Sequence, residues 1–333
     1  MTEPVVDRIF GVSRDGFDAL ALELFAFQYE HNPLYKAYAD TFGKKPGNVW
    51  QVNEIPFLPI AFFKTHEVKT GLFDPAVVFT SSGTTGQGGS RHFVKDLSLY
   101  EESFQRGFRL FYGDIKELAV MALLPSYLER QGSSLVYMAE KLIKDSENKY
   151  SRFYLDDTSA LIQSLQESEK QLDHQPGTGK KNLLLGVTYA LLDLPVQEKL
   201  NLSHTIIMET GGMKGRRKEM VREEVHALLC EKFGVETIHS EYGMTELLSQ
   251  AYSSGGGIFR CPPWMQVLVR EEEDPLRVNE TGTGAVNVID LANIHSCCFI
   301  ATDDAGRVQT DGSFEVLGRL DGSDMRGCSL LTV

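Results

Sequence analysis

A run of glycines and hydroxyl-bearing residues in the first third of the chain has the composition of a phosphate-binding loop. The run extends from Phe79 to Gly88. Its glycines permit positive φ and close backbone approach, so that successive N–H groups can point at one anion, and its hydroxyls add further donors. The residues expected to contact phosphate are Ser81, Ser82, Gly83, Thr84, Thr85 and Gly86. This pattern favours a nucleotide-dependent enzyme.

The residues around the run indicate where the loop lies and which known phosphate-binding motifs it does not match. Residues 76–79 form a short apolar stretch typical of a buried strand, which predicts that the loop lies at the carboxyl end of a strand. No Lys-Ser or Lys-Thr pair follows at the Walker spacing, and the glycines do not fit the GxGxxG pattern. Taken alone, the run is equally compatible with a polar surface turn.

Length, composition and charge limit the classes of function. The chain has 333 residues, of which 42% are hydrophobic and 24% charged, enough for about two domains or one large domain with an appendage. The net charge of −13 repels polyanions, which argues against a nucleic-acid partner and favours small ligands. The sequence contains neither a signal peptide nor an apolar stretch near the roughly 20 residues of a spanning helix, so we expect a cytoplasmic protein.

The cysteines are few and irregularly spaced. They stand at positions 230, 261, 297, 298 and 328, an odd number without a CxxC pair. This spacing argues against a disulfide framework and against a structural zinc site. At least one thiol is therefore expected to be free.

Helical and strand patterns alternate through residues 17–250, as in an α/β protein with a largely parallel sheet. Helices are predicted over 17–38 with a break near Pro33, over 97–111, from an N-cap at Ser133 to 144, over 157–172 and over 217–233. Strands are predicted over 118–124, 182–187, 204–208 and 236–239. Residues 173–181 are predicted to form a surface loop.

Three polar or glycine-rich turns follow strands of this predicted sheet. They are the loop after Phe79, residues 209–212, and residues 242–246, the last of which is expected to open a helix that continues to Gln250. Ligands of open parallel sheets bind outside the carboxyl ends of the strands. The three turns are therefore expected to converge on one site.

The pattern changes after about residue 255 to alternating strand signals. Strands are predicted over 266–270, 284–291, 297–302 and 313–317, with a hairpin turn at Asp311-Gly312. We therefore divide the chain into an α/β core over residues 1–254 and a β-rich subdomain over residues 255–333 that ends in a short C-terminal arm.

Three motifs in order give the chain a resemblance to the adenylate-forming superfamily of acyl- and aryl-CoA ligases, peptide-synthetase adenylation domains and firefly-type luciferases. They are residues 81–86, Tyr242-Gly243-Met244-Thr245-Glu246 and Thr302-Asp303-Asp304. Within the superfamily the chain most resembles the acyl-protein synthetases of the bacterial bioluminescence fatty-acid reductase complex, and more distantly phenylacetate-CoA ligase. The resemblance extends from about Pro56 to Val333. It implies an α/β domain of the adenylate-forming N-terminal type, with helices flanking mainly parallel sheets.

The resemblance also implies roles for single residues. Residues 81–86 would hold the β- and γ-phosphates of ATP, and Glu246 would hold Mg²⁺, although an acid in the first turn of a helix is the plainer interpretation of Glu246. The other implied contacts are Tyr242 and Gly243 beside adenine, Gly211 and Gly212 lining its pocket, Thr245 at the α-phosphate, and Asp304 and Arg319 at ribose or phosphate. Gly211 and Gly212 are also compatible with a simple turn, and Asp303 stands where the family usually has glycine.

The chain differs from CoA-ester-forming relatives after Arg319. Those relatives continue for about a hundred residues, a small domain that forms a lid with a catalytic lysine, whereas this sequence runs only to Val333. We therefore expect the usual C-terminal lid domain to be missing, and Lys64 and Lys214 are the candidate substitutes for its lysine, although each is also compatible with an ordinary solvated lysine. The resemblance implies that Cys328 accepts the acyl group as a thiolate, beside Arg326; a buried, inert thiol is the alternative.

The predicted function is ATP- and Mg²⁺-dependent activation of a carboxylic acid, a fatty acid in the first instance, to acyl-AMP, followed by transfer to a protein thiol. The expected partner is an acyl-accepting protein similar to an acyl-CoA reductase. A phenylacetate-type acyl- or aryl-CoA ligase and a non-catalytic nucleotide-binding module are the alternatives.

Overall fold

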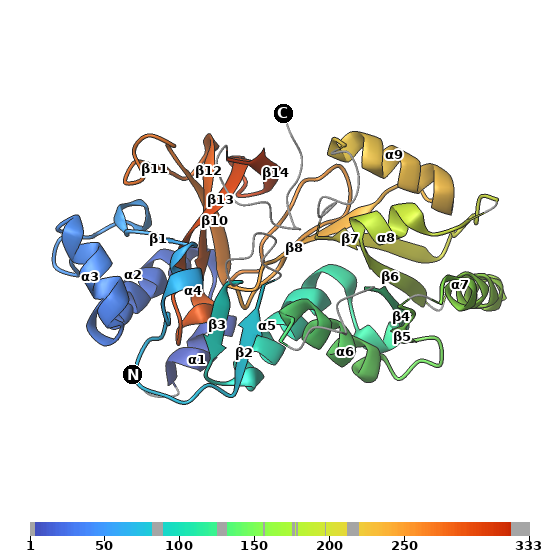
Figure 1. Cartoon of the computed structure of the whole chain (residues 1–333), viewed down its shortest axis with the longest axis horizontal. Helices are drawn as coiled ribbons and strands as arrows, with labels where there is room; N and C mark the ends of the chain where they lie inside the picture. The colour runs from blue at the N-terminus through green and yellow to red at the C-terminus, as the bar shows by residue number, and fades with distance from the viewer. Residues whose placement is uncertain are drawn as a thin grey trace. The chain divides into compact units, whose positions relative to one another are not determined.

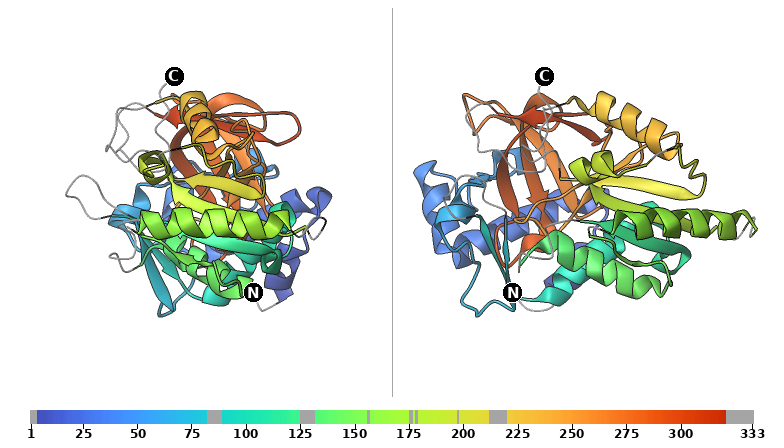
Figure 2. Two further views of the ribbon diagram at one scale, coloured as in Figure 1. Left: turned by 90° about the vertical axis from the view of Figure 1, so that its right-hand side faces the viewer. Right: turned by 45° about the vertical axis from the view of Figure 1, so that its right-hand side comes forward.

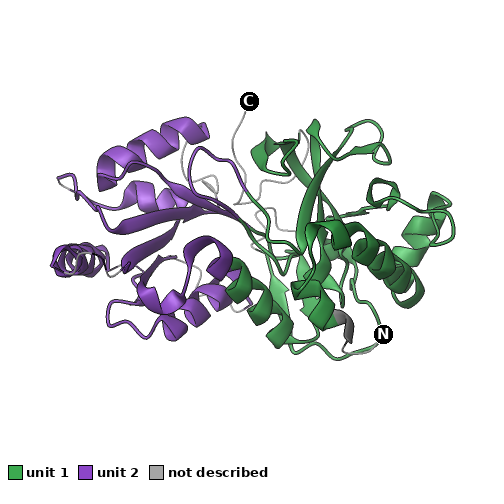
Figure 3. Cartoon of the chain, turned by 180° about the vertical axis from the view of Figure 1, so that it is seen from behind, with its two compact units in different colours: residues 1–107, 243–251, 260–324 green, residues 108–242, 252–259, 325–333 purple. Residues whose placement is uncertain are grey.

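A computed structural model describes residues 4–81, 89–124, 132–155, 157–174, 177, 179–196, 198–211 and 220–320 (Figure 1). Backbone contacts divide the chain into two compact units (Figure 3). Among the described residues, unit 1 contains those within 1–107, 243–251 and 260–324, and unit 2 those within 108–242 and 252–259. Each unit is assembled from segments that are distant in sequence, so the division at residue 254 stays a prediction.

Unit 2 is built on a parallel sheet with strand order β5-β4-β6-β7-β8-β9. The strands are β4 (Leu118–Leu123), β5 (Arg152–Phe153), β6 (Lys181–Val187), β7 (Thr205–Thr210), β8 (His239–Tyr242) and β9 (Ala251–Ser253). Each neighbouring pair from β5 to β8 is parallel. Every residue of β4 is buried, as expected for a central strand covered on both faces.

Helices α6 (Ser134–Ser146), α7 (Thr158–Asp173), α8 (Thr188–Asp193) and α9 (Arg222–Phe233) pack beside this sheet (Figure 2). The side chain of Ser133 caps α6 by accepting from the N–H of Val136, and that of Asp157 caps α7 by accepting from the N–H of Ala160. Helices α6 and α7 and the strands β4, β6 and β7 confirm the sequence prediction to within about two residues at their ends, whereas α8 was not predicted.

Unit 1 contains a mainly antiparallel sheet with strand order β1-β13-β12-β10-β11, and β14 pairs with β13. The strands are β1 (Leu58–Pro59), β10 (Met265–Arg270), β11 (Val278–Asn279), β12 (Gly282–Asp290), β13 (Phe299–Val308) and β14 (Phe314–Arg319). The β-rich segment is thus confirmed, including the hairpin at Asp311-Gly312, where Gly312 has φ of 81°. The short strand β1, which was not predicted, pairs parallel to β13.

The N-terminal helices α1 (Pro4–Phe10), α2 (Arg14–His31) and α3 (Pro33–Thr41) belong to unit 1. The predicted break near Pro33 is confirmed, because α2 ends at His31 and Asn32 caps α3. The buried Gln28 of α2 donates to the carbonyls of Asn293 and Ile294. Helix α2 is thereby attached to the segment that follows β12.

The strand before the predicted phosphate loop does not belong to the parallel sheet. Strand β2 (Val77–Thr80) forms a separate antiparallel pair with β3 (Arg91–Val94), ahead of α5 (Leu97–Tyr112). The buried ring of Phe79 lies 5.3 Å from that of Tyr100 on α5, so one face of this hairpin is packed. The expectation that three turns share one edge of a parallel sheet is therefore wrong for the first of them.

Two further boundaries differ from prediction. The expected helix from Tyr242 to Gln250 is wrong, because residues 243–250 form an irregular segment whose backbone groups bond to side chains from elsewhere in unit 1, described below. Helix α9 begins at Arg222 rather than at residue 217, since Val221 has extended dihedrals; residues 212–219 lie outside the described part of the chain. Within the described residues, no helix combines the length and apolar character needed to cross a bilayer.

Candidate active site

The segment that carries Thr245 and Glu246 is held by a buried carboxylate. Asp290, at the end of β12, accepts hydrogen bonds from the N–H groups of Leu248 (2.8 Å) and Ser249 (3.0 Å) and from the Ser249 hydroxyl (2.6 Å). A helix over 246–250 would direct the N–H of Ser249 to the carbonyl of Thr245 instead. The interactions with Asp290 therefore account for the irregular conformation of this segment.

The carbonyl groups of the same segment are bound by two other buried side chains. His92 Nδ1 donates to the carbonyl of Thr245 (2.8 Å), and Asn293 Nδ2 donates to the carbonyl of Glu246 (2.7 Å). His92 Nε2 lies 2.9 Å from Asn293 Oδ1. Burial lowers the pKa of His92 to about 4, whereas the hydrogen bonds from its two ring nitrogens to the Thr245 carbonyl and to Asn293 Oδ1 act to raise it. His92 is only 1% exposed.

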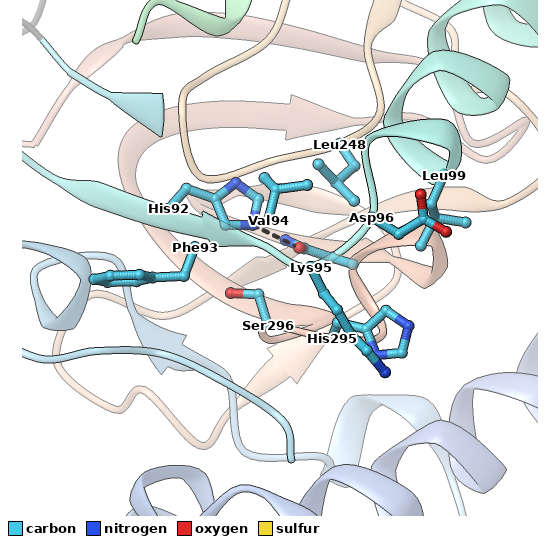
Figure 4. A pocket seen from close by; sticks show the side chains of 10 residues that line it. His92, Phe93, Val94, Lys95, Asp96, Leu99, Leu248, His295 and Ser296 are labelled. Atoms are coloured by element: carbon cyan, nitrogen blue, oxygen red, sulfur yellow. Dashed lines mark hydrogen bonds between the residues drawn. The ribbon is translucent and has the colours of Figure 1, made fainter. Parts of the chain in front are cut away.

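A small cavity lies beside His92 (Figure 4). It measures about 10 Å³ and is lined by His92, Phe93, Val94, Lys95, Asp96, Leu99, Leu248, Asn293, His295 and Ser296. Such a volume accommodates about one water molecule. The cavity is too small for an acid or a nucleotide.

Glu246 and Thr245 have the chemistry expected of a magnesium and phosphate site. The Glu246 residue is 1% exposed, and Thr245 is half-buried. A carboxylate oxygen is a hard ligand suited to Mg²⁺, which usually takes one or two protein carboxylates and completes its shell with waters and substrate phosphates. Within the part of the chain that the structure describes, no three acidic, histidine or cysteine side chains gather into a metal site.

Asp304 and Arg319 are brought together by the pairing of β13 with β14. They are direct partners in the antiparallel register. Arg319 Nη2 donates to Asp303 Oδ2 (3.1 Å). Asp303, where the family usually has glycine, therefore forms an ion pair with one of the predicted site residues.

The two ends of the predicted phosphate loop are bonded to each other. The N–H of Ser81 donates to the carbonyl of Ser90 (3.0 Å), and the N–H of Ser90 donates to Ser81 Oγ (2.8 Å). The backbone of Gly89 approaches Ser81 so closely that a Cβ there would lie 2.0 Å from the Ser81 carbonyl oxygen. Ser82, Gly83, Thr84, Thr85 and Gly86 lie outside the described residues.

Lys64 lies on helix α4 (Phe62–Thr65) and is half-buried. Its neighbour Phe63 packs edge-on against the ring of His92, at a centroid distance of 5.9 Å. The alternative lysine, Lys214, and the predicted acyl acceptor, Cys328, lie outside the described residues.

In unit 2, Gly211 and Tyr242 lie at the same edge of the sheet, because β7 and β8 run parallel in register. Gly211 has φ of 76°, a conformation that favours glycine. The Tyr242 ring is 4% exposed and packs against Phe259 at 5.9 Å. Gly243 follows β8 directly, and Gly212 lies outside the described residues.

Two acidic residues at this edge, Glu209 and Glu241, were not predicted from the sequence. Glu209 of β7 accepts from Thr188 Oγ1 (2.6 Å), and Glu241 of β8 accepts from Thr210 Oγ1. Burial raises the pKa of Glu241 to about 7, with a further contribution from the charge of Glu209 and against the hydrogen bond from Thr210. Glu241 therefore changes charge near neutral pH.

Comparison with solved structures defines the class of protein. The chain resembles 2-hydroxyisobutyryl-CoA ligase with a TM-score of 0.64 over 95% of this chain and 71% of the ligase, at 15% identity. It also resembles ATP-bound MatB from Rhodopseudomonas palustris, with a TM-score of 0.52 over 75% of this chain at 17% identity. It spans 49%, about half, of the MatB chain. The fold is that of the adenylate-forming ligases, an α/β fold.

Sequence comparison then gives the family. The family described as Acyl-protein synthetase, LuxE, matches residues 13–332, and the chain belongs to it. A long-chain-fatty-acid–luciferin-component ligase of Vibrio harveyi is 23% identical over 336 aligned residues, which cover 92% of this chain and 84% of that protein. The resemblance stated from the motifs is thus confirmed. The chain is an enzyme, a ligase that activates an acid and transfers the acyl group to a protein.

Gly89 provides a test of how the phosphate loop is closed. In Gly89→Ala the new Cβ would collide with the Ser81 carbonyl, and because backbone has to move, we expect a loss of stability of roughly 2 kcal/mol or more together with weaker nucleotide binding. Gly47→Ala is the control, since Gly47 has open space around it and no left-handed backbone that would strain a side chain. Urea denaturation and nucleotide titration measure both effects; equal losses in the two variants would contradict this account of the loop.

Glu241 provides a pH test. Its pKa of about 7 in the folded protein exceeds the ordinary value of 4.5, so the unfolded chain loses this proton first, and folding stability falls as pH rises from about 4.5 through 7. Between pH 5 and pH 8 wild type should lose up to about 3 kcal/mol more than Glu241→Gln, because one pKa unit corresponds to about 1.4 kcal/mol. Chemical denaturation across this range measures the difference, and parallel pH profiles for the two proteins would refute the assignment.

Proposed function

We propose that this enzyme activates a long-chain fatty acid with ATP and passes the acyl group through its own Cys328 to a partner protein. The acid and the acceptor class are those in the printed name of the Vibrio harveyi relative. The observation that carries the proposal is the placement of Thr245 and Glu246 on a buried segment fixed by His92, Asn293 and Asp290. The family match supplies the reaction class to which this segment belongs.

In the first step the fatty-acid carboxylate attacks the α-phosphorus of ATP. A bond forms between a carboxylate oxygen and the α-phosphorus, and the bond to the β-phosphate bridging oxygen breaks, which releases pyrophosphate. No general base is needed, because a carboxylic acid is ionised at neutral pH. The enzyme contributes position and charge stabilisation at the phosphates.

Unit 1 supplies the groups proposed for the phosphates and ribose. The Thr245 hydroxyl donates a hydrogen bond to an α-phosphate oxygen. The loop of residues 81–86 binds the β- and γ-phosphates. Glu246 would hold Mg²⁺, which neutralises phosphate charge when bound. Asp304 accepts hydrogen bonds from the ribose hydroxyls, and Arg319, oriented by Asp303, contributes positive charge. Lys64 is proposed to neutralise the negative charge of the α-phosphate.

Tyr242 and three glycines are the groups proposed for adenine. The base lies against Tyr242, whose ring is fixed by Phe259. Gly211, Gly212 and Gly243 leave room beside it because they carry no side chain.

The described thiols support Cys328 as the acyl acceptor. In the second step a thiolate attacks the acyl carbonyl, and AMP leaves with the carboxylate oxygen that linked it to the acyl group. A nucleophilic cysteine needs a low pKa. Burial raises the pKa of all four described cysteines, Cys230, Cys261, Cys297 and Cys298.

Cys328 is tested by separating activation from transfer. In Cys328→Ser we expect fatty-acid-dependent ATP–pyrophosphate exchange to persist within about twofold, because no thiol takes part in adenylation, while hydroxylamine-sensitive acyl labelling of the enzyme disappears. Cys230→Ser is the matched control and should keep both activities. Acyl labelling that survives in Cys328→Ser, or acyl-CoA as the product of the isolated enzyme, would contradict the proposal.

Glu246 is tested by an isosteric change. Glu246→Gln removes the charge that would bind Mg²⁺, so we expect pyrophosphate exchange to fall roughly 100-fold or more, with a raised Mg²⁺ requirement. Glu273→Gln, an exposed acid in the same unit, serves as the control and should match wild type. Exchange by Glu246→Gln at the wild-type rate and Mg²⁺ dependence would exclude this role.

A further inference from the structure

One polar link in unit 1 joins strand β3, which follows the predicted phosphate loop in sequence, to the Thr245-Glu246 segment. His92 is the second residue of β3, and only Gly89, Ser90 and Arg91 separate it from the end of the loop run at Gly88. Its ring donates through Nδ1 to Thr245 and faces Asn293 through Nε2. Asn293 in turn donates to the carbonyl of Glu246. Strand β3 is thus linked through His92 to the carbonyl of Thr245, and through His92 and Asn293 to the carbonyl of Glu246.

These two carbonyls determine the direction of the Glu246 side chain. A peptide group is planar, so each residue has only two soft backbone dihedrals, one on either side of its Cα. His92 fixes the plane that precedes the Glu246 Cα, and Asn293 fixes the plane that follows it. With both planes held, the Cα–Cβ direction of Glu246 is determined as well.

The link is buried, with a cavity of about 10 Å³ beside it. His92 is 1% exposed, and Asn293 is fully buried. Phe63 packs against one side of the His92 ring, and Asp290 holds the chain immediately after Glu246. In such surroundings an unsatisfied carbonyl costs roughly 1–3 kcal/mol, enough to move the segment to another conformation.

We propose that His92 and Asn293 are positioning residues for adenylation. They hold Thr245 and Glu246 in place against strand β3, so that the groups proposed for the α-phosphate and Mg²⁺ are oriented before substrate binds. Neither residue needs to touch a reacting atom. The inference rests on the proposed function and assigns to it two residues that none of the three motifs contains.

The test is a set of variants assayed by ATP–pyrophosphate exchange with palmitate, at a temperature where each remains folded by circular dichroism. His92→Ala and Asn293→Ala should lower kcat by roughly 10- to 100-fold, the scale of a displacement of about 1 Å, and leave the KM for palmitate within about threefold. The double variant should lose little more than either single one, because both residues belong to one link.

Asn182→Ala is the matched control for a lost buried asparagine. Asn182 is fully buried in unit 2, where its amide donates to Thr205 Oγ1 (3.1 Å) and accepts from Ser168. We expect a comparable loss of thermal stability with an unchanged kcat. An equal loss of kcat in Asn182→Ala would show general destabilisation and overturn the proposal.

Two conservative variants keep the test decisive if the alanine variants do not fold. His92→Asn places an amide N–H near the position of Nδ1 and retains the donor to Thr245, whereas His92→Gln places it near Nε2. The Asn variant should keep the higher kcat, and equal or reversed rates would overturn the proposal. If the wild type catalyses exchange and all variants do so at the same rate, the positioning role is refuted and the proposed function stands. If the wild type catalyses no exchange with any fatty acid, both the proposed function and this inference are refuted.

Discussion

The candidate site depends on how the backbone of residues 245–249 satisfies its hydrogen bonds without being a helix or a strand. Residues 246–249 are buried, and buried N–H and C=O groups are costly unless they are paired. Asp290 accepts from the amides of this segment, while His92 and Asn293 donate to its carbonyls. The conformation that presents Thr245 and Glu246 is therefore set by three side chains from β3, β12 and the residues just after β12.

The sheet of unit 1 provides part of this constraint, through the end of β12 and the residues that follow it. Strand β12 ends at Asp290, and the buried Gln28 of α2 binds the carbonyls of Asn293 and Ile294. The same short segment thus bonds both to helix α2 and to the segment of residues 245–249. On the neighbouring strands, Arg270 donates to the carbonyl of Thr302, just ahead of Asp303 and Asp304. Polar side chains thus bind the backbone at Thr245, at Glu246 and just ahead of Asp304.

The sequence correctly predicted those helices and strands that are determined by the local residue pattern. The prediction was wrong where residues distant in the sequence determine the backbone conformation. Apolar runs such as residues 183–187 and caps such as Ser133 and Asp157 predicted the matching strands and helices of unit 2 closely, because burial and capping act within a few residues. The helix expected over 242–250 is the clearest error. Glu-Leu-Leu-Ser-Gln has reasonable helix propensity, but Asp290, about forty residues later, takes its amides. The motifs located Thr245 and Glu246, whereas Asn293 and Asp290 carry no local signal that distinguishes them from ordinary polar residues after a strand.

The central claim is that the acid is activated as an acyl adenylate and then passed to a thiol, and oxygen transfer tests it most directly. Fatty acid labelled with ¹⁸O in its carboxylate should be incubated with the enzyme and ATP, and the nucleotide and phosphate products analysed by mass spectrometry. Attack of the carboxylate on the α-phosphorus, followed by acyl transfer, predicts AMP that carries one ¹⁸O atom and unlabelled pyrophosphate. Formation of ADP with the label in inorganic phosphate, or of AMP without label, would contradict the account.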